Sequence, residues 1–487
     1  MKLHWVGLAA LVALAPPAAG ARSLGALDFE PCVLTTPGSA ASVEAYCTTV
    51  QAPEDHDRPD GRRIDLALAW VPARDSAEAD PVFMLAGGPG QGARESYPGA
   101  APAFSEVRRK RHILLLDQRG TGGSNPLVCR MGDAMEALDS VDVEAWTDMA
   151  RDCLAEIGER ADPAFYTTTD AIRDLDLVRE RIGAETVNLV GISYGTRVAQ
   201  QYAARFPEHT RSVVIDGIVP NDLVLGSEHA ANLETALEQH FDGCRNDAAC
   251  REALGDPRAL LDRVLAQADG DEAPVVRYRD AVTHELHEER LGRGHVVTVT
   301  RMYAYAPHTA SLLPLVLAEA ARGQPEALMA QARVMSRSLD EQINHGMQLS
   351  VMCAEDVDEM RVREADADSV LGNLLVEVSQ AQCAVWPRGQ RPEGFRAPLA
   401  TTVPALVLSG ELDPVTPPRY GEAVVPHLPN GRHLVLAGQG HGTLAIGCMP
   451  RVLARFLDTL DAAELDTTCL DGLRATPPFT GFHGWEP

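Results

Sequence analysis

The chain has 487 residues, of which 45% are hydrophobic and 23% are charged, as in an ordinary globular protein. Its 69 acidic residues outnumber its 43 lysines and arginines, so the formal net charge is -26. A protein this acidic repels polyanions at long range, which argues against nucleic acid and anionic membranes as partners.

Residues 1–21 are expected to form a secretory signal peptide. Lys2 precedes an apolar run at residues 5–14, and Ala19, Gly20 and Ala21 have the A-x-A spacing of a cleavage site. The apolar run is too short to span a bilayer, which takes about 20 residues. A buried N-terminal helix is the alternative. The signal predicts export to the periplasm or the exterior.

The ten cysteines form an even number, which fits an oxidising compartment. Ten cysteines allow about 945 pairings, so the sequence does not fix the connectivity. Because they occur in close pairs, nearest-neighbour disulfides are expected between Cys32 and Cys47, Cys129 and Cys153, Cys244 and Cys250, Cys353 and Cys383, and Cys448 and Cys469. None has C-x-x-C spacing, so neither zinc nor another metal is expected.

Residues 22–219 predict the first part of an α/β core. Residues 22–44 are interpreted as a loop-rich lead-in, and residues 46–50 and 63–71 as an edge hairpin, since Ile64, Leu66 and Leu68 alternate with less apolar positions. Further strands are expected at residues 81–86, 113–116, 187–190 and 213–218, and helices at 167–182 and 198–206. This alternation predicts a mostly parallel sheet with helices on both faces.

The pattern changes at residues 220–400, which predict an inserted, mainly helical cap domain. One strand-like run stands out there, at residues 296–300. Short buried strands return at residues 405–409 and 433–436, followed by a helix at 450–457. Residues 401–487 are therefore expected to complete the core.

The strongest chemical signal is the sequence Gly-Ile-Ser-Tyr-Gly at residues 191–195. It follows a predicted buried strand and opens a predicted helix, the context of a nucleophile elbow that exposes a serine at a tight turn. Gly191 and Gly195 fit this turn, where side chains would collide with the adjoining strand and helix. Ser193 is the predicted nucleophile; a glycine-rich turn with a bystander serine is the alternative.

A serine hydroxyl needs a positioned base, and the base needs an acid that orients it. Asp413 follows the predicted strand at 405–409, and His441 follows the one at 433–436. The order Ser193, Asp413, His441 is that of an α/β-hydrolase, whose triad lies on loops at one edge of the sheet. Taken singly, Asp413 could be a turn-forming aspartate and His441 a solvated histidine.

Acyl transfer also needs hydrogen-bond donors for the developing oxyanion. The backbone N–H of Tyr194, directly after the nucleophile, is one candidate. A second is expected from Gly87 or Gly88, because a glycine-rich turn after an early strand can approach the substrate closely. An ordinary turn is the alternative for this glycine-rich segment.

Several motifs together resemble the α/β-hydrolase serine peptidases of the proline iminopeptidase and tripeptidyl aminopeptidase family. They are AGGPGQG at residues 86–92, DQRGTGGS at 117–124, GISYGT at 191–196, SGELDPVTPP at 409–418 and GQGHG at 438–442. Segments around Cys353 and Cys383 resemble the secreted tripeptidyl aminopeptidases. Iminopeptidases usually have histidine where this chain has Ala86, which favours the larger, secreted branch.

The resemblance implies an exopeptidase that needs no cofactor and acts on peptides with a free N-terminus. It also implies that acids of the cap bind the substrate's α-amine; Glu355 is the main candidate and Asp356 the second, and solvated surface acids are the alternative. The expected function is a secreted serine aminopeptidase that releases a tripeptide or a single residue such as proline. A carboxylesterase or amidase is the alternative. A non-catalytic binding protein is disfavoured because all three triad residues are present.

Overall fold

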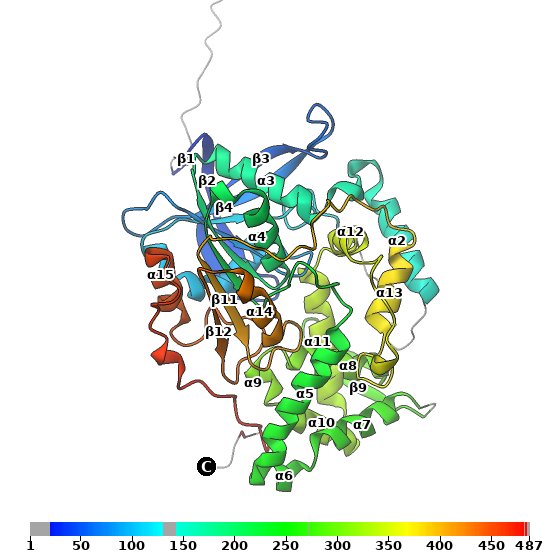
Figure 1. Cartoon of the computed structure of the whole chain (residues 1–487). Coiled ribbons are helices and arrows are strands. Elements are labelled where there is room, and N and C mark those ends of the chain that lie inside the picture. Colours follow the sequence, from blue (N-terminus) through cyan, green and yellow to red (C-terminus); the bar gives the residue numbers. More distant parts are fainter. Residues whose placement is uncertain (1–19, 130–142, 271, 482, 485–487) are drawn as a thin grey trace, which may run out of the picture.

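The computed structural model describes residues 20–129, 143–270, 272–481 and 483–484. Most of the expected signal peptide lies outside these residues. The described chain forms a ten-stranded sheet of order β1-β2-β3-β4-β6-β5-β7-β8-β11-β12 and a separate hairpin, β9-β10 (Figure 1).

The parallel part of the sheet runs from β6 to β12, and its short strands are apolar because both faces are covered. Leu189 and Val190 are neighbours in β7, yet they belong to core clusters on opposite faces. A mostly parallel sheet with helices on both sides is thereby confirmed. Its strands are β5 (Val82–Leu85), β6 (Ile113–Leu116), β7 (Val187–Ile192), β8 (Thr210–Asp216), β11 (Ala405–Gly410) and β12 (Gly431–Leu436).

The antiparallel part differs from the sequence prediction in two respects. It comprises β1 (Arg22–Leu24), β2 (Leu27–Thr35), β3 (Ser42–Pro53) and β4 (Arg63–Val71). The predicted loop-rich lead-in is wrong, because it forms β1 and β2; β2 is mostly exposed, so its apolar signal is weak. β4 is also not an edge strand, since it pairs with both β3 and β6.

Two sets of helices cover the sheet. One face carries α3 (Thr168–Arg181), α4 (Tyr194–Arg205) and α14 (Pro418–Val424), and the other carries α1 (Ala93–Ala100) and α15 (Met449–Thr459). Helix α2 (Val143–Ile157) packs against α12 and α13. A capping box at Thr167 and Asp170 fixes the start of α3.

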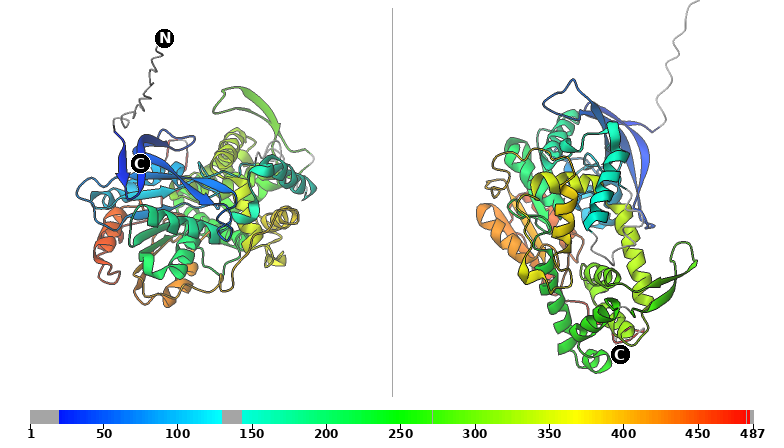
Figure 2. Two further views of the ribbon diagram at one scale, coloured as in Figure 1. Left: turned by 90° about the horizontal axis from the view of Figure 1, so that it is seen from above. Right: turned by 90° about the vertical axis from the view of Figure 1, so that its right-hand side faces the viewer.

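Residues between β8 and β11 contain mainly helices, and helices α5–α11 surround a hydrophobic cluster of their own. In Figure 1 and in the right-hand view of Figure 2, these helices lie at the opposite end of the molecule from β1–β4. The elements are α5 (His229–Asn246), α6 (Ala248–Leu254), α7 (Pro257–Ala268), β9 (Val275–Arg279), β10 (Leu286–Arg290), α8 (Arg293–Tyr303), α9 (Pro307–Ala310), α10 (Leu313–Ala321), α11 (Glu326–Gln342), α12 (His345–Glu355) and α13 (Leu374–Cys383).

The strand predicted at residues 296–300 is wrong, because these residues lie within helix α8. Its β-branched side chains favour a strand locally. The buried positions Val296, Val299, Thr300 and Tyr303 nevertheless recur at helical spacing, and packing against the surrounding helices determines the outcome.

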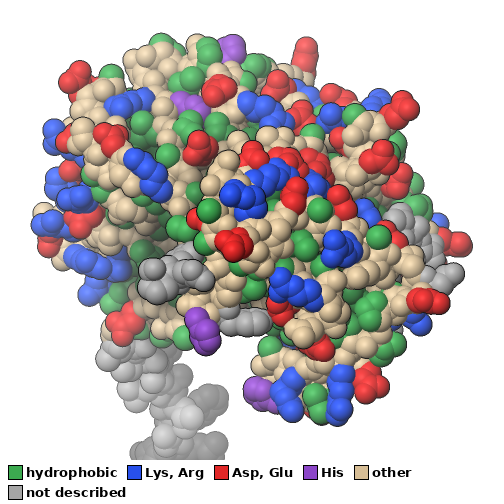
Figure 3. Space-filling view, turned by 90° about the horizontal axis from the view of Figure 1, so that it is seen from below, with side chains coloured by type: hydrophobic (Ala, Val, Ile, Leu, Met, Phe, Trp, Pro, Cys, Tyr) green, Lys and Arg blue, Asp and Glu red, His purple; other side chains and the backbone are tan. Residues whose placement is uncertain are grey.

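All five predicted disulfides are confirmed: Cys32–Cys47, Cys129–Cys153, Cys244–Cys250, Cys353–Cys383 and Cys448–Cys469. On the face shown in Figure 3, acidic and basic side chains are interspersed, so the net negative charge is not gathered into one patch there. Within the described part of the chain, no helix has both the length and the apolar character needed to cross a membrane.

Candidate active site

Ser193 lies at the junction between strand β7 and helix α4. Its backbone angles, φ 55° and ψ -126°, lie in a region that residues with a side chain rarely adopt. The Ser193 N–H donates to the Asp216 carbonyl at 2.9 Å, which ties the turn to the end of β8. Strained backbone of this kind clusters at functional sites and fits a nucleophile elbow.

The two flanking glycines are required by close packing. A Cβ on Gly191 would collide with the backbone of Gly195, and a Cβ on Gly195 would collide with the carbonyl oxygen of Leu85. The structure therefore confirms the steric reason for glycine at both positions. Helix α4 can start directly under β5 only because these side chains are absent.

Asp413 and His441 form a direct pair. His441 Nδ1 lies 2.8 Å from Asp413 Oδ2, and Thr416 Oγ1 lies 2.8 Å from the same carboxylate oxygen and 3.1 Å from Nδ1. The Asp413 Oδ1 atom accepts the N–H groups of Val415 and Thr416 at 2.8 Å each. The carboxylate is fixed on both oxygens, and it can hold the imidazole with Nε2 free to act as a base.

The electrostatics of this pair favour an ionised acid. Burial acts to raise the pKa of Asp413, but the charge and hydrogen bond of His441 outweigh it, so the pKa is lowered. For His441, burial acts to lower the pKa; the opposing effects of Asp413, and then of Asp216, are larger and raise it. The imidazolium formed during proton transfer would be stabilised by both carboxylates.

The three candidate triad residues meet at the carboxyl end of β8. Ser193 is bonded to the backbone of Asp216, and a Cβ on the next residue, Gly217, would lie 3.0 Å from His441 Cε1. Gly217 thus leaves room for the imidazole beside the elbow. The structure brings together the loops that carry Ser193, Asp413 and His441, as the sequence predicted for parallel strands.

Asp216 is a buried residue of the site that the sequence reasoning missed. Its carboxylate accepts hydrogen bonds from the Thr443 N–H at 2.6 Å, the Thr443 hydroxyl at 2.9 Å and the Leu444 N–H at 2.9 Å. It therefore anchors the loop just after His441. An aspartate ending an otherwise apolar strand was the available signal, since such a charge needs partners when buried.

We expect Asp216→Asn to shift the acid limb of the kcat/KM profile to lower pH. His441 must be neutral to accept a proton, so activity rises as pH passes its pKa, and the Asp216 charge raises that pKa. Loss of the charge lowers the pKa, and a looser loop should lower kcat/KM by about tenfold. Thr443→Val is the matched control, because it removes a hydrogen bond but keeps the charge; an unchanged limb in Asp216→Asn would contradict the prediction.

The predicted oxyanion donors lie beside Ser193. A Cβ on the buried Gly87 would be 3.0 Å from Ser193 Cβ, and Gly88 follows with φ 104° and a cis bond to Pro89. Tyr194 is the first residue of α4, where N–H groups have no acceptor within the helix. Candidate donors from two separate loops therefore lie close to Ser193.

Glu355 is connected to the elbow through side chains. It is 1% exposed and accepts hydrogen bonds from the Thr168 N–H at 2.7 Å and the Thr168 hydroxyl at 3.0 Å. Thr168 Oγ1 lies 2.6 Å from the hydroxyl oxygen of Tyr194, which accepts a hydrogen bond from the side-chain amide of Gln118. Burial raises the pKa of Glu355 to about 7, despite the opposing charge of Arg197.

Asp356 has a different environment. It is fully buried and pairs with Arg197 at 2.9 Å and Arg396 at 3.2 Å, while Glu355 lies 3.6 Å from Arg197. The alternative that these two acids are solvated surface groups is therefore wrong. The two buried carboxylates share Arg197 as a counterion, because an unpaired buried charge is costly.

Two family models match the chain: one described as alpha/beta hydrolase fold at residues 80–249, and one described as TAP-like protein at residues 368–469. The chain is 26% identical over 467 residues to serine protease Hip1 of Mycobacterium tuberculosis, covering 88% of each protein. It is 28% identical to the tripeptidyl aminopeptidase of Streptomyces coelicolor, covering 44% of this chain and 43% of that protein.

A proline iminopeptidase of Aeromonas sobria is 30% identical over 34% of this chain and 35% of that protein. Among solved structures, a proline iminopeptidase from Mycobacterium smegmatis has a TM-score of 0.42 and 17% identity, covering 85% of this chain and 99% of that one. The chain has the α/β-hydrolase fold, and its sequence is similar to those of serine peptidases, among them a tripeptidyl aminopeptidase and a proline iminopeptidase.

Proposed function

We propose that the protein is an exported serine aminopeptidase that releases a short N-terminal fragment from peptides. The observation that carries this proposal is the Asp413–His441 pair, 2.8 Å apart, at the sheet edge where the Ser193 elbow ends. The five disulfides favour an oxidising compartment and support export. The names of the relatives support peptides as the substrate class.

In the proposed reaction, His441 takes the hydroxyl proton of Ser193 while Oγ bonds to the peptide carbonyl carbon. The carbonyl electron pair moves to oxygen, where the N–H groups of Tyr194 and of Gly87 or Gly88 stabilise it. As the intermediate collapses, the C–N bond breaks and His441 gives its proton to the leaving amine. Water then attacks the carbonyl of the acyl-enzyme while His441 takes its proton. The ester bond to Ser193 breaks, His441 returns the proton to Oγ, and the fragment leaves as a carboxylic acid.

We assign residues 220–400 the role of a cap that restricts access to this chemistry. The cap contacts His441 directly, since the Tyr305 carbonyl accepts a hydrogen bond from the backbone N–H of His441 at 2.8 Å and the two rings pack edge to face at 5.3 Å. In this proposal, a substrate chain that extends past the nucleophile ends within the cap. This restriction suits an exopeptidase and favours a fragment of defined length.

Glu355 is our candidate for binding the α-amine, and Asp356 is the counterion of Arg197 and Arg396. Its carboxyl group lies on the network that contains Tyr194, next to the nucleophile, and has a pKa of about 7 because it is buried. An arriving ammonium ion would favour the ionised carboxylate and compensate for its burial.

The test is a panel of anilides of Pro, Ala and Ala-Ala-Phe, each with a free and an acetylated amine, alongside a simple ester. We expect free-amine anilides to be cleaved at least tenfold faster than blocked ones, and Glu355→Gln to raise KM for the free-amine anilides only. The anilide cleaved fastest identifies the fragment length.

Faster turnover of blocked anilides would contradict an aminopeptidase, and preference for the ester would indicate a carboxylesterase. An equal loss on free and blocked substrates would assign Glu355 a structural role.

A further inference from the structure

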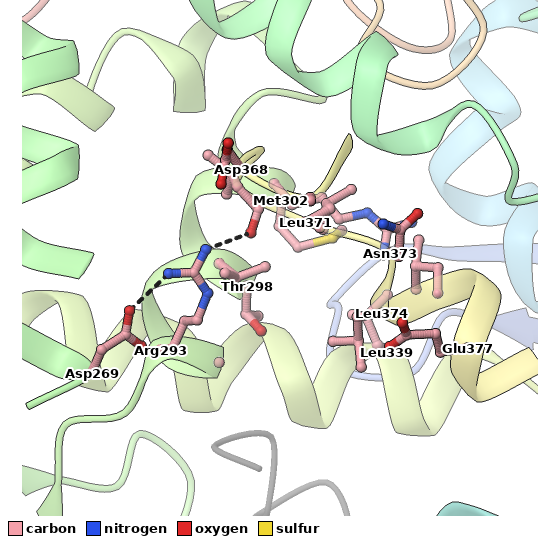
Figure 4. Close-up of a pocket in the computed structure, with 17 residues that line it drawn as sticks. Asp269, Arg293, Thr298, Met302, Leu339, Asp368, Leu371, Asn373, Leu374 and Glu377 are labelled. Carbon is pink, nitrogen blue, oxygen red and sulfur yellow. Dashed lines mark hydrogen bonds and ion pairs between the residues drawn. The ribbon is translucent and has the colours of Figure 1, made fainter. Parts of the chain in front are cut away.

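A cavity of about 590 Å³ lies between helix α8 and the chain that leads into α13 (Figure 4). This volume is in the range of sites that bind small molecules and short peptides. Helix α8 contributes Gly294, Val297, Thr298 and Arg301, which share one face because of their i, i+3, i+4, i+7 spacing. Leucines of the facing chain, at positions 371 and 374, make the opposite wall largely apolar.

The two arginines of the cavity differ in their partners. Arg293 pairs with Asp269 at 2.9 Å and donates to the Val370 carbonyl, so it holds the wall together (Figure 4). Arg301 is half-buried, and no described residue forms an ion pair or a hydrogen bond with its guanidinium. A guanidinium that has lost part of its hydration without gaining a protein partner favours binding of an anion, and a planar carboxylate fits its geometry.

The chain segment that lines the cavity continues to a residue in contact with His441. One turn beyond Arg301, Tyr305 contacts His441 through both its carbonyl and its ring. His229, in the first turn of α5, is influenced by both residues: burial, and next the charges of Arg301 and His441, lower its pKa to about 3. Arg301 and His441 therefore both lie within electrostatic range of the His229 imidazole.

We infer that this cavity is a substrate subsite in which Arg301 binds a carboxylate of the peptide. The inference rests on the proposed peptidase function and adds a preference for acidic substrates. The carboxylate comes either from an Asp or Glu side chain or from the C-terminus of a short peptide. Asp368 and Glu377 lie apart on the cavity wall and oppose a second anion, so one carboxylate is bound, at Arg301.

Binding to the Ser193→Ala protein tests the inference without turnover. The probes are pentapeptide amides with a free N-terminus in which Glu replaces Gln at each position in turn, and the all-Gln peptide with a free C-terminal carboxylate. We expect at least one carboxylate peptide to bind about tenfold more tightly than its neutral counterpart by calorimetry. The position of Glu, or the C-terminal acid, identifies the source of the carboxylate.

Added to Ser193→Ala, Arg301→Gln should abolish this preference, and Arg301→Lys should restore part of it. Arg322→Gln is the matched control, because it removes one positive charge from an exposed pair with Glu319, away from the cavity lining. Equal binding of all peptides, or a preference that survives Arg301→Gln, would overturn the inference. Tight binding without cleavage by the wild-type protein would instead overturn the peptidase proposal and leave the subsite in place.

Discussion

Ser193→Ala is expected to lower kcat on the preferred free-amine anilide by about 10⁶-fold, because no other group can form the acyl-enzyme. The hydroxyl is small and lies at the end of a helix, so its loss removes no core packing. The thermal midpoint should therefore stay within a few degrees of the wild-type value. A fluorophosphonate probe should label the wild-type protein and leave the variant unlabelled.

Ser39→Ala provides the matched control, since Ser39 is an exposed serine in a turn between β2 and β3. It should retain full activity and labelling. Residual activity of Ser193→Ala above about 1% of wild type would place the nucleophile elsewhere. Loss of labelling together with a large drop in thermal midpoint would show that the substitution acts through folding and would contradict the assignment.

The sequence was most informative where chemistry and backbone geometry depend on the same residues. The elbow at Ser193 needs glycines on both sides, a strand before it and a helix after it, and each leaves a local signal. Asp413 and His441 could be placed beside Ser193 because parallel strands bring their following loops to one edge. The disulfides followed from short sequence separations, which make pairing of neighbours geometrically easy.

Features that depend on packing between residues distant in sequence could not be predicted from local sequence patterns. Strand β2, between β1 and β3, is mostly exposed, so it lacks the apolar run that reveals a strand buried on both faces. The β-branched run in α8 is helical because its buried face packs against other helices. The burial of Glu355 depends on Thr168 and Arg197, which are 187 and 158 residues away in the chain, and no local pattern encodes such contacts.

The arginine of the DQRGTGGS motif at residues 117–124 is also held by contacts that are distant in sequence. Arg119 is completely buried and forms a two-point pair with Asp174, at 2.6 Å from Nε and 2.7 Å from Nη2. Its remaining donors reach the carbonyls of Glu54, Phe165 and Pro53. One side chain thereby links the loop after β6 to β3 and α3, so the motif stabilises the core beside the active site.

Asp174→Asn is therefore expected to destabilise the protein by about 3–5 kcal/mol, because it leaves the Arg119 charge buried without a counterion. The measurement is urea unfolding at neutral pH. Asp148→Asn is the matched control: it breaks an exposed pair with Arg151, in which both side chains are more than half exposed, and should change stability by less than about 0.5 kcal/mol.

The pH dependence provides a second test of the same pair. Burial acts to raise the pKa of Asp174, but the charge and hydrogen bonds of Arg119 outweigh it and lower the pKa below the ordinary 3.8. The carboxylate therefore contributes its stabilisation fully above pH 3.8, and that contribution is lost as the pH falls through the lowered value. The free-energy difference between wild type and Asp174→Asn should accordingly be constant near neutral pH and shrink below pH 3.8. A difference under about 1 kcal/mol at neutral pH would contradict the pairing.

Arg119→Met combined with Asp174→Leu should be less destabilised than Asp174→Asn alone, because the double variant buries no unpaired charge.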